Sequence, residues 1–100
     1  MLILVPMDST NLEEAKITKV FDVKVWAQLR IEEGELVEVV HNEKFDGFEN
    51  WSEAVVVNSD GEPVMQFMEM SMIVLVAHTQ KTIDDIVEAY LFRELHDIAY

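Results

Sequence analysis

The chain has 100 residues, of which 50% are hydrophobic, and this predicts one compact domain with one core over residues 1–100. Lys and Arg number 7 and Asp and Glu number 20, so the formal net charge is −13. A surface this acidic repels phosphate backbones and anionic lipids, so we expect neither nucleic acid nor a membrane as a partner. Because the sequence has no cysteine, disulfides, thiolate catalysis and thiolate-bound metal centres are excluded.

The apolar segments are short. The longest uninterrupted one, residues 72–77, is far below the ~20 residues that cross a bilayer, so it is predicted to be a buried strand. Residues 1–5 are apolar but have no basic lead, and Pro6 to Asp8 interrupt the run too soon for a signal peptide. We therefore expect no targeting or membrane segment, and a cytoplasmic location by default.

Strands dominate the predicted first half of the chain. Residues 2–6 form a continuous apolar run, which is typical of a strand covered on both faces, and residues 17–21 are apolar enough for a short strand. Residues 23–31 alternate, with apolar side chains at the odd positions. The even positions, predicted to form a wetter face, are Lys24, Trp26, Gln28 and Arg30. A turn at Gly34 then predicts an antiparallel hairpin over about residues 24–41.

The second half is predicted to alternate strands and helices. Residues 54–57 and 72–77 are apolar strands, and residues 63–70 between them form a short amphipathic helix. Thr82 and Asp85 predict a capping box at the start of a last helix, whose apolar stripe is widened by Phe92 and Leu95. A strand–helix–strand unit with apolar strands implies parallel pairing through a right-handed crossover. Together with the hairpin, this predicts an α/β domain with a mixed sheet and helices on both faces.

Ligands of such sheets bind beyond the carboxyl ends of the parallel strands. Here that edge is predicted to consist of the loops at residues 6–11, 58–62 and 78–81. Asp60 and Glu62 are expected to cap the following helix, a commoner use of such residues than anion binding. His78 could be a metal ligand, a proton carrier or a loop residue without function. The histidines lack the spacing of a zinc motif, so we expect no dedicated metal site.

Two clusters of side chains are candidates for a functional role. Four methionines could bind a soft metal or fill the core adaptably: Met65, Met68, Met70 and Met72. Three aromatic residues could form an interaction patch or pack under a loop: Phe45, Phe48 and Trp51. No set of nucleophile, base and orienting residue is discernible, and no glycine-rich phosphate loop, so we expect a protein that is not an enzyme.

Several segments, taken in order, form a pattern typical of a known family: residues 2–8, 12–14, 16–21, 34–39 with Asn42, and 82–90. This pattern resembles the dinitrogenase iron-molybdenum cofactor biosynthesis (nitrogenase accessory factor) family. The family's histidine falls on Val20 and the glycine two residues on falls on Asp22, whereas Phe21 is kept. In the segment that matches the family's glycine-rich loop, residues 58–62, Gly61 is retained.

The resemblance implies a ribonuclease-H-like three-layer α/β/α domain with a mixed, five-stranded sheet. It also implies a non-enzymatic accessory protein that carries a metal–sulfur cofactor. The ligand would then lie against Asp8, Asn58, Ser59, Gly61 and His78. The missing histidine and glycines, together with the charge of −13, suggest the alternative of a protein–protein adaptor that binds a basic partner and no cofactor. The sequence alone does not predict an oligomeric state.

Overall fold

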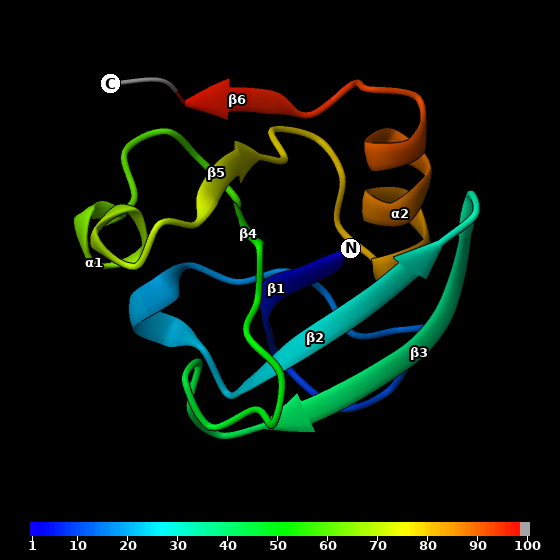
Figure 1. The fold of residues 1–100 in the computed structure, drawn as a ribbon, viewed down its shortest axis with the longest axis horizontal. Coiled ribbons are helices and arrows are strands. Elements are labelled where there is room, and N and C mark those ends of the chain that lie inside the picture. The colour runs from blue at the N-terminus through cyan, green and yellow to red at the C-terminus, as the bar shows by residue number, and fades with distance from the viewer. Residues whose placement is uncertain (99–100) are drawn as a thin grey trace.

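A computed structural model describes residues 1–98 and contains one mixed sheet with helices packed against it (Figure 1). In chain order the elements are β1 (Leu2–Met7), the 3-10 helix η1 (Val20–Asp22), β2 (Val25–Glu32), β3 (Glu35–Asn42), β4 (Ala54–Val57), α1 (Met65–Glu69), β5 (Ile73–Val76), α2 (Ile83–Leu91) and β6 (His96–Ile98). Among these residues, no helix is long and apolar enough to cross a membrane.

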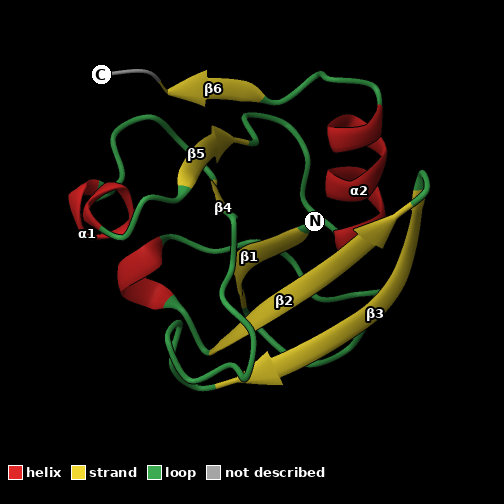
Figure 2. Ribbon diagram, in the orientation of Figure 1, coloured by secondary structure: helices red, strands yellow, loops and turns green. Residues whose placement is uncertain are grey.

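The sheet has the strand order β3-β2-β1-β4-β5-β6 (Figure 2). β1 pairs in parallel with β4, and β4 in parallel with β5, whereas β2, β3 and β6 run antiparallel to their neighbours. The predicted α/β class, the hairpin and the parallel pairing are confirmed. The strand count is wrong, because the sheet formed by residues 1–98 has six strands and not five. The missed strand is β6, whose sequence His-Asp-Ile is too short and too polar to show a strand pattern.

Both faces of the sheet are covered, which confirms the predicted three layers. Ile3, Val5 and Met7 of β1 pack on one face with Ile83 and Ile86 of α2. On the other face, Leu4 belongs to a second cluster, which includes Trp26 of β2, Val20 of η1 and Phe67 of α1. The apolar interior is therefore two clusters separated by the sheet, where the chain length predicted one core. Burial on both faces explains why β1 and β4 are apolar at every position.

The face of β2 that carries Trp26 and Gln28 is more buried than the sequence predicts. Trp26 is 4% exposed and Gln28 is 5% exposed, because residues 43–53 fold across them. The Gln28 side-chain amide donates to the backbone oxygen of Asn50 and to Ser52 Oγ, each at 2.9 Å. Phe45 packs edge-on against Trp26 at a centroid distance of 5.9 Å. Two hydrogen bonds thus compensate for the burial of a polar side chain.

Three local predictions also need correction. Residues 17–21 form no strand; Ile17 makes an isolated bridge to Met7, and η1 follows. α1 begins after Val64, and neither Asp60 nor Glu62 caps it in the described part of the chain. Phe92 is 72% exposed and does not extend the apolar stripe, because α2 ends at Leu91. The capping box at Thr82 and Asp85 is present as predicted.

Candidate functional site

The topology gathers the predicted ligand-facing loops at one edge of the sheet. β1, β4 and β5 run in the same direction, and Val57 at the end of β4 lies opposite Val76 at the end of β5. Asp8, Asn58 and His78 therefore all follow the same ends of neighbouring strands. Asp8 and His78 are exposed, as is Gly61, whereas Asn58 and Ser59 are half-buried.

Asp8 holds its own loop in place. Its Oδ1 accepts the backbone N–H of Lys16 at 2.9 Å, and its backbone N–H donates to the oxygen of Lys16 at 3.0 Å. This pair of bonds closes the loop between residues 8 and 16 beside the end of β1. The carboxylate thus has a structural role that the sequence did not indicate.

Glu62 ties the loop after β4 to η1. Its Oε1 accepts the backbone N–H of Val20 at 3.0 Å, across 42 residues of sequence. The acid that we predicted to cap α1 therefore satisfies a donor of another segment. Val20 is also the position on which the family's histidine falls. The Val20 side chain itself is buried in the second apolar cluster.

These residues do not fit an anionic metal–sulfur cluster. Such a cluster needs free donors and positive potential. Here two backbone N–H groups of the edge, those of Lys16 and Val20, already donate to the carboxylates of Asp8 and Glu62. Within residues 1–98, no three His, Asp or Glu side chains converge as a metal site.

The edge does bring together two histidines that are 18 residues apart in the sequence. His78 follows β5 and His96 begins β6, and their ring centroids lie 5.9 Å apart with the planes at 45°. Both side chains are exposed. Sequence reasoning missed His96 because nothing in its segment indicates a strand beside β5. The occurrence of histidine at both positions is the available signal, and it is a weak one.

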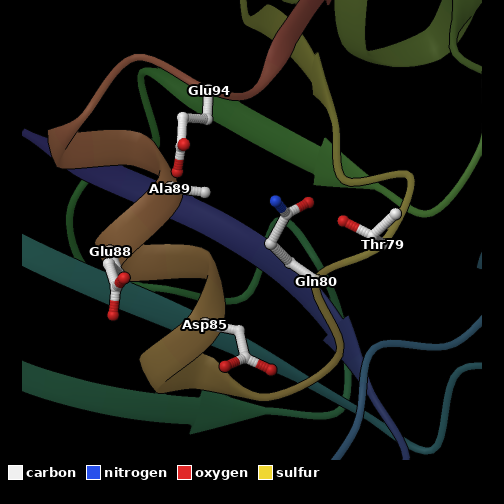
Figure 3. Close-up of a pocket in the computed structure, with 6 residues that line it drawn as sticks. All are labelled: Thr79, Gln80, Asp85, Glu88, Ala89 and Glu94. Atoms are coloured by element: carbon white, nitrogen blue, oxygen red, sulfur yellow. The ribbon is translucent and has the colours of Figure 1, made fainter.

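A shallow hollow of about 300 Å³ lies beside α2 (Figure 3). Its lining is polar and acidic: Thr79, Gln80, Asp85, Glu88, Ala89 and Glu94. Asp85 is committed to the capping box, where the N–H groups of Thr82 and Lys81 lower the pKa of its carboxyl group. The negative charge of this hollow repels anionic ligands. Of its three carboxylates, that of Asp85 has a structural role in the capping box.

The two side-chain clusters separate into buried and exposed members. Met72 is buried, and Met68 and Met70 pack against the same apolar cluster, whereas Met65 is 61% exposed. Met68, Met70 and Met72 thus fill the core. Phe45 and Phe48 also pack against this cluster, whereas Trp51 is 60% exposed. The aromatic group is therefore mostly packing under a loop, with one exposed ring.

The outer edge of the sheet at β3 is long and acidic. β3 has eight residues and pairs with β2 on one side, and no described strand pairs with its other side. Glu35 and Glu38 are exposed along it, and Val37 and Val40 are 51% and 40% exposed. Backbone groups, carboxylates and apolar side chains are thus all accessible on one strand.

Comparisons with known proteins support the fold and no more. No protein-family model and no curated protein matches the chain. A solved structure, described as the crystal structure of PH0822, is similar over 98% of this chain and 96% of its own, with a TM-score of 0.74. Its sequence identity to this chain is 14%, so the similarity is one of architecture.

Proposed function

We propose that this protein is a non-enzymatic adaptor whose β3 edge binds an extended, basic segment of a partner protein. The observation that carries the proposal is the eight-residue edge strand with acidic side chains and an unpaired outer side within the described chain. An open edge presents alternating N–H and C=O groups, which an added strand satisfies. Main-chain bonds would supply affinity, and side chains would supply selectivity.

Charge favours a basic partner over a second copy of this chain. Four carboxylates lie on the hairpin, those of Glu32, Glu33, Glu35 and Glu38. Its cation, Arg30, is engaged by two of them, with Nη1 3.5 Å from Glu32 and Nε 3.4 Å from Glu38. Two copies paired edge to edge would oppose like charges, which is unfavourable, whereas Lys or Arg side chains would be attracted.

The exposed valines supply the apolar part of the surface. Val37 lies at the irregularity that shifts the register beside Arg30 and Ile31, and Val40 is paired with Gln28. Glu38 and Val40 pair with Arg30 and Gln28 and therefore lie on the same face of the sheet. An incoming strand would match that face if a basic residue lay opposite Glu38 and a β-branched residue, two positions along, lay opposite Val40. We therefore expect specificity for segments with a basic and a β-branched residue two positions apart over uniformly basic ones.

The experiment uses a synthetic peptide in which lysine and valine take turns at every second position, so that one face carries both, and it follows backbone amide shifts by NMR during titration. We expect the largest shifts at residues 35–42 and an affinity that falls with added salt. The test variant is Glu35→Lys with Glu38→Lys, and the control is Glu13→Lys with Glu14→Lys. Both doubles raise the net charge by the same amount. The β3 double should weaken binding by about tenfold or more, which corresponds to about 1.4 kcal/mol.

Two outcomes would contradict the adaptor. Equal weakening by both double variants would mean that the peptide responds to overall charge and not to β3. Shifts spread over the acidic surface, without a maximum at residues 35–42, would mean the same.

The family resemblance supports a second hypothesis, a carrier of a metal–sulfur cofactor. The grouping of Asp8, Asn58 and His78 beyond neighbouring strand ends favours it. The carboxylates of Asp8 and Glu62 count against it, since they occupy the donors of that edge. Titration of the protein with molybdate or a preformed iron–sulfur cofactor tests the hypothesis, and the absence of uptake and of spectral change would remove it.

A further inference from the structure

The geometry points to a binding site for a divalent transition-metal ion, of the zinc or copper class, formed by His78 and His96. This site goes beyond the adaptor proposal and depends on neither β3 nor a partner. The two side chains come from neighbouring strands: His96 lies opposite Val76, and His78 follows two residues after Val76. Pairing of β5 with β6 therefore determines how close the two imidazoles lie.

The separation of the rings suits a shared ion. Zinc–imidazole bonds are about 2.0–2.1 Å long, and the ring centre lies roughly 1 Å behind the bonding nitrogen, so two imidazoles on one tetrahedral ion have centroids about 5 Å apart. The observed separation is 5.9 Å, with a tilt of 45° between the planes. Because both side chains are exposed, small rotations about their χ angles can close the difference.

The chemistry of the pair selects the class of metal. Imidazole nitrogen prefers zinc, copper and nickel, whereas calcium and magnesium need oxygen ligands. The net charge of −13 raises the local concentration of cations around the whole molecule. Since the chain has no cysteine, no thiolate competes for such an ion. Two protein ligands leave coordination positions for water or for a donor from another molecule.

A bound ion would link the short strand β6 to the end of β5. β6 has three residues and pairs with β5 at three positions. The native fold holds both imidazoles together and the unfolded chain does not, so the ion binds the folded state preferentially and stabilises it. Metal binding should therefore raise the melting temperature and slow amide exchange in β6.

The test is a titration of the full chain with Zn²⁺, followed by NMR of the histidine ring signals and by thermal unfolding. The chain has three histidines, so His41→Gln is a matched control for His78→Gln and His96→Gln. We expect a 1:1 complex that shifts the rings of His78 and His96, weakens by at least tenfold in either variant and persists in His41→Gln. Mg²⁺ at the same concentration should shift neither ring.

The proposal is overturned if Zn²⁺ leaves both rings unshifted. It is also overturned if binding survives in the double variant His78→Gln with His96→Gln, since carboxylates would then hold the ion. Neither position is buried, so both variants are expected to fold, and the thermal transition in the absence of metal verifies this.

Discussion

The two edges of the sheet differ in length, charge and the way in which they are held. β3 lies at one edge of the sheet and β6 at the other (Figure 1). β3 pairs with β2 at seven positions, whereas β6 pairs with β5 at three. β3 carries glutamates along an open strand, and β6 begins with a histidine beside another histidine. A long edge can offer its backbone to a partner. A short edge strand has few backbone groups to offer a partner. Its effect is to place its side chains next to those of the neighbouring strand.

The connections to the two edge strands explain this difference. β3 is reached through a tight turn, in which Glu33 and Gly34 adopt φ values of 52° and 79°. The turn is local and determines the register of the pairs next to it, up to the irregularity at Val37. β6 is reached only after α2 ends and Arg93 adopts a φ of 57°, so its position depends on the packing of α2 on the sheet. Perturbing each support should therefore loosen one edge more than the other.

The largest effect is expected from Leu29→Ala. Leu29 lies in β2, is fully buried and pairs with Val39 of β3. Removing its side chain leaves a cavity beneath the hairpin and should lower the free energy of unfolding by about 2–5 kcal/mol. Urea denaturation measures the loss. Amide exchange should accelerate more in β3 than in β6, and a uniform acceleration would show that the two edges are not separately supported.

A smaller effect, on the opposite edge, is expected from Thr82→Ala. Thr82 Oγ1 accepts the N–H of Asp85 at 3.2 Å in the capping box of α2. Loss of this cap should lower the free energy of unfolding by about 1 kcal/mol. Exchange should accelerate in α2 and β6 rather than in β3. Thr79→Ala, at an exposed position three residues earlier, is the control and should change little.

The smallest expected effect is a pH dependence from His41 on β3. Burial lowers the pKa of His41 below its ordinary value of 6.5, and its Nε2 is buried without a hydrogen-bond partner within the described chain. The unfolded chain then takes up the proton more readily than the native state. Stability should therefore fall as pH decreases below about 6.5, and level off below the folded-state pKa.

Urea denaturation between pH 8 and pH 5 measures this dependence. His41→Gln should flatten the pH profile in this range. An unchanged profile would mean that burial of His41 on this edge has no energetic consequence.

Local patterns predicted much of this fold correctly. The alternation over residues 23–31 and the turn at Gly34 predict the hairpin because neighbours in the sequence determine it. The capping box of Thr82 and Asp85 spans a single turn, so it too could be predicted. The apolar runs of β4 and β5 indicate parallel central strands, and these place Asp8, Asn58 and His78 at one edge. The hairpin and the capping box require information from only a few adjacent residues, whereas the parallel pairing follows from the order of strand, helix and strand along the chain.

Contacts between distant segments could not be predicted in this way. The cover over Trp26 and Gln28 comes from residues 43–53, and the partner of Glu62 is a backbone group 42 residues earlier in the chain. β6 forms by pairing with the free edge of β5, and this pairing brings His96 close to His78.

The sequence by itself thus determined the acidic charge, the α/β class, the hairpin and the edge on which loops gather. The tertiary structure decided the sixth strand, the partner of Glu62 and the histidine pair. The physical reason is that periodicity and capping depend on neighbours along the chain. Hydrogen bonds and contacts across 18 or more residues form only once the sheet has brought their partners together.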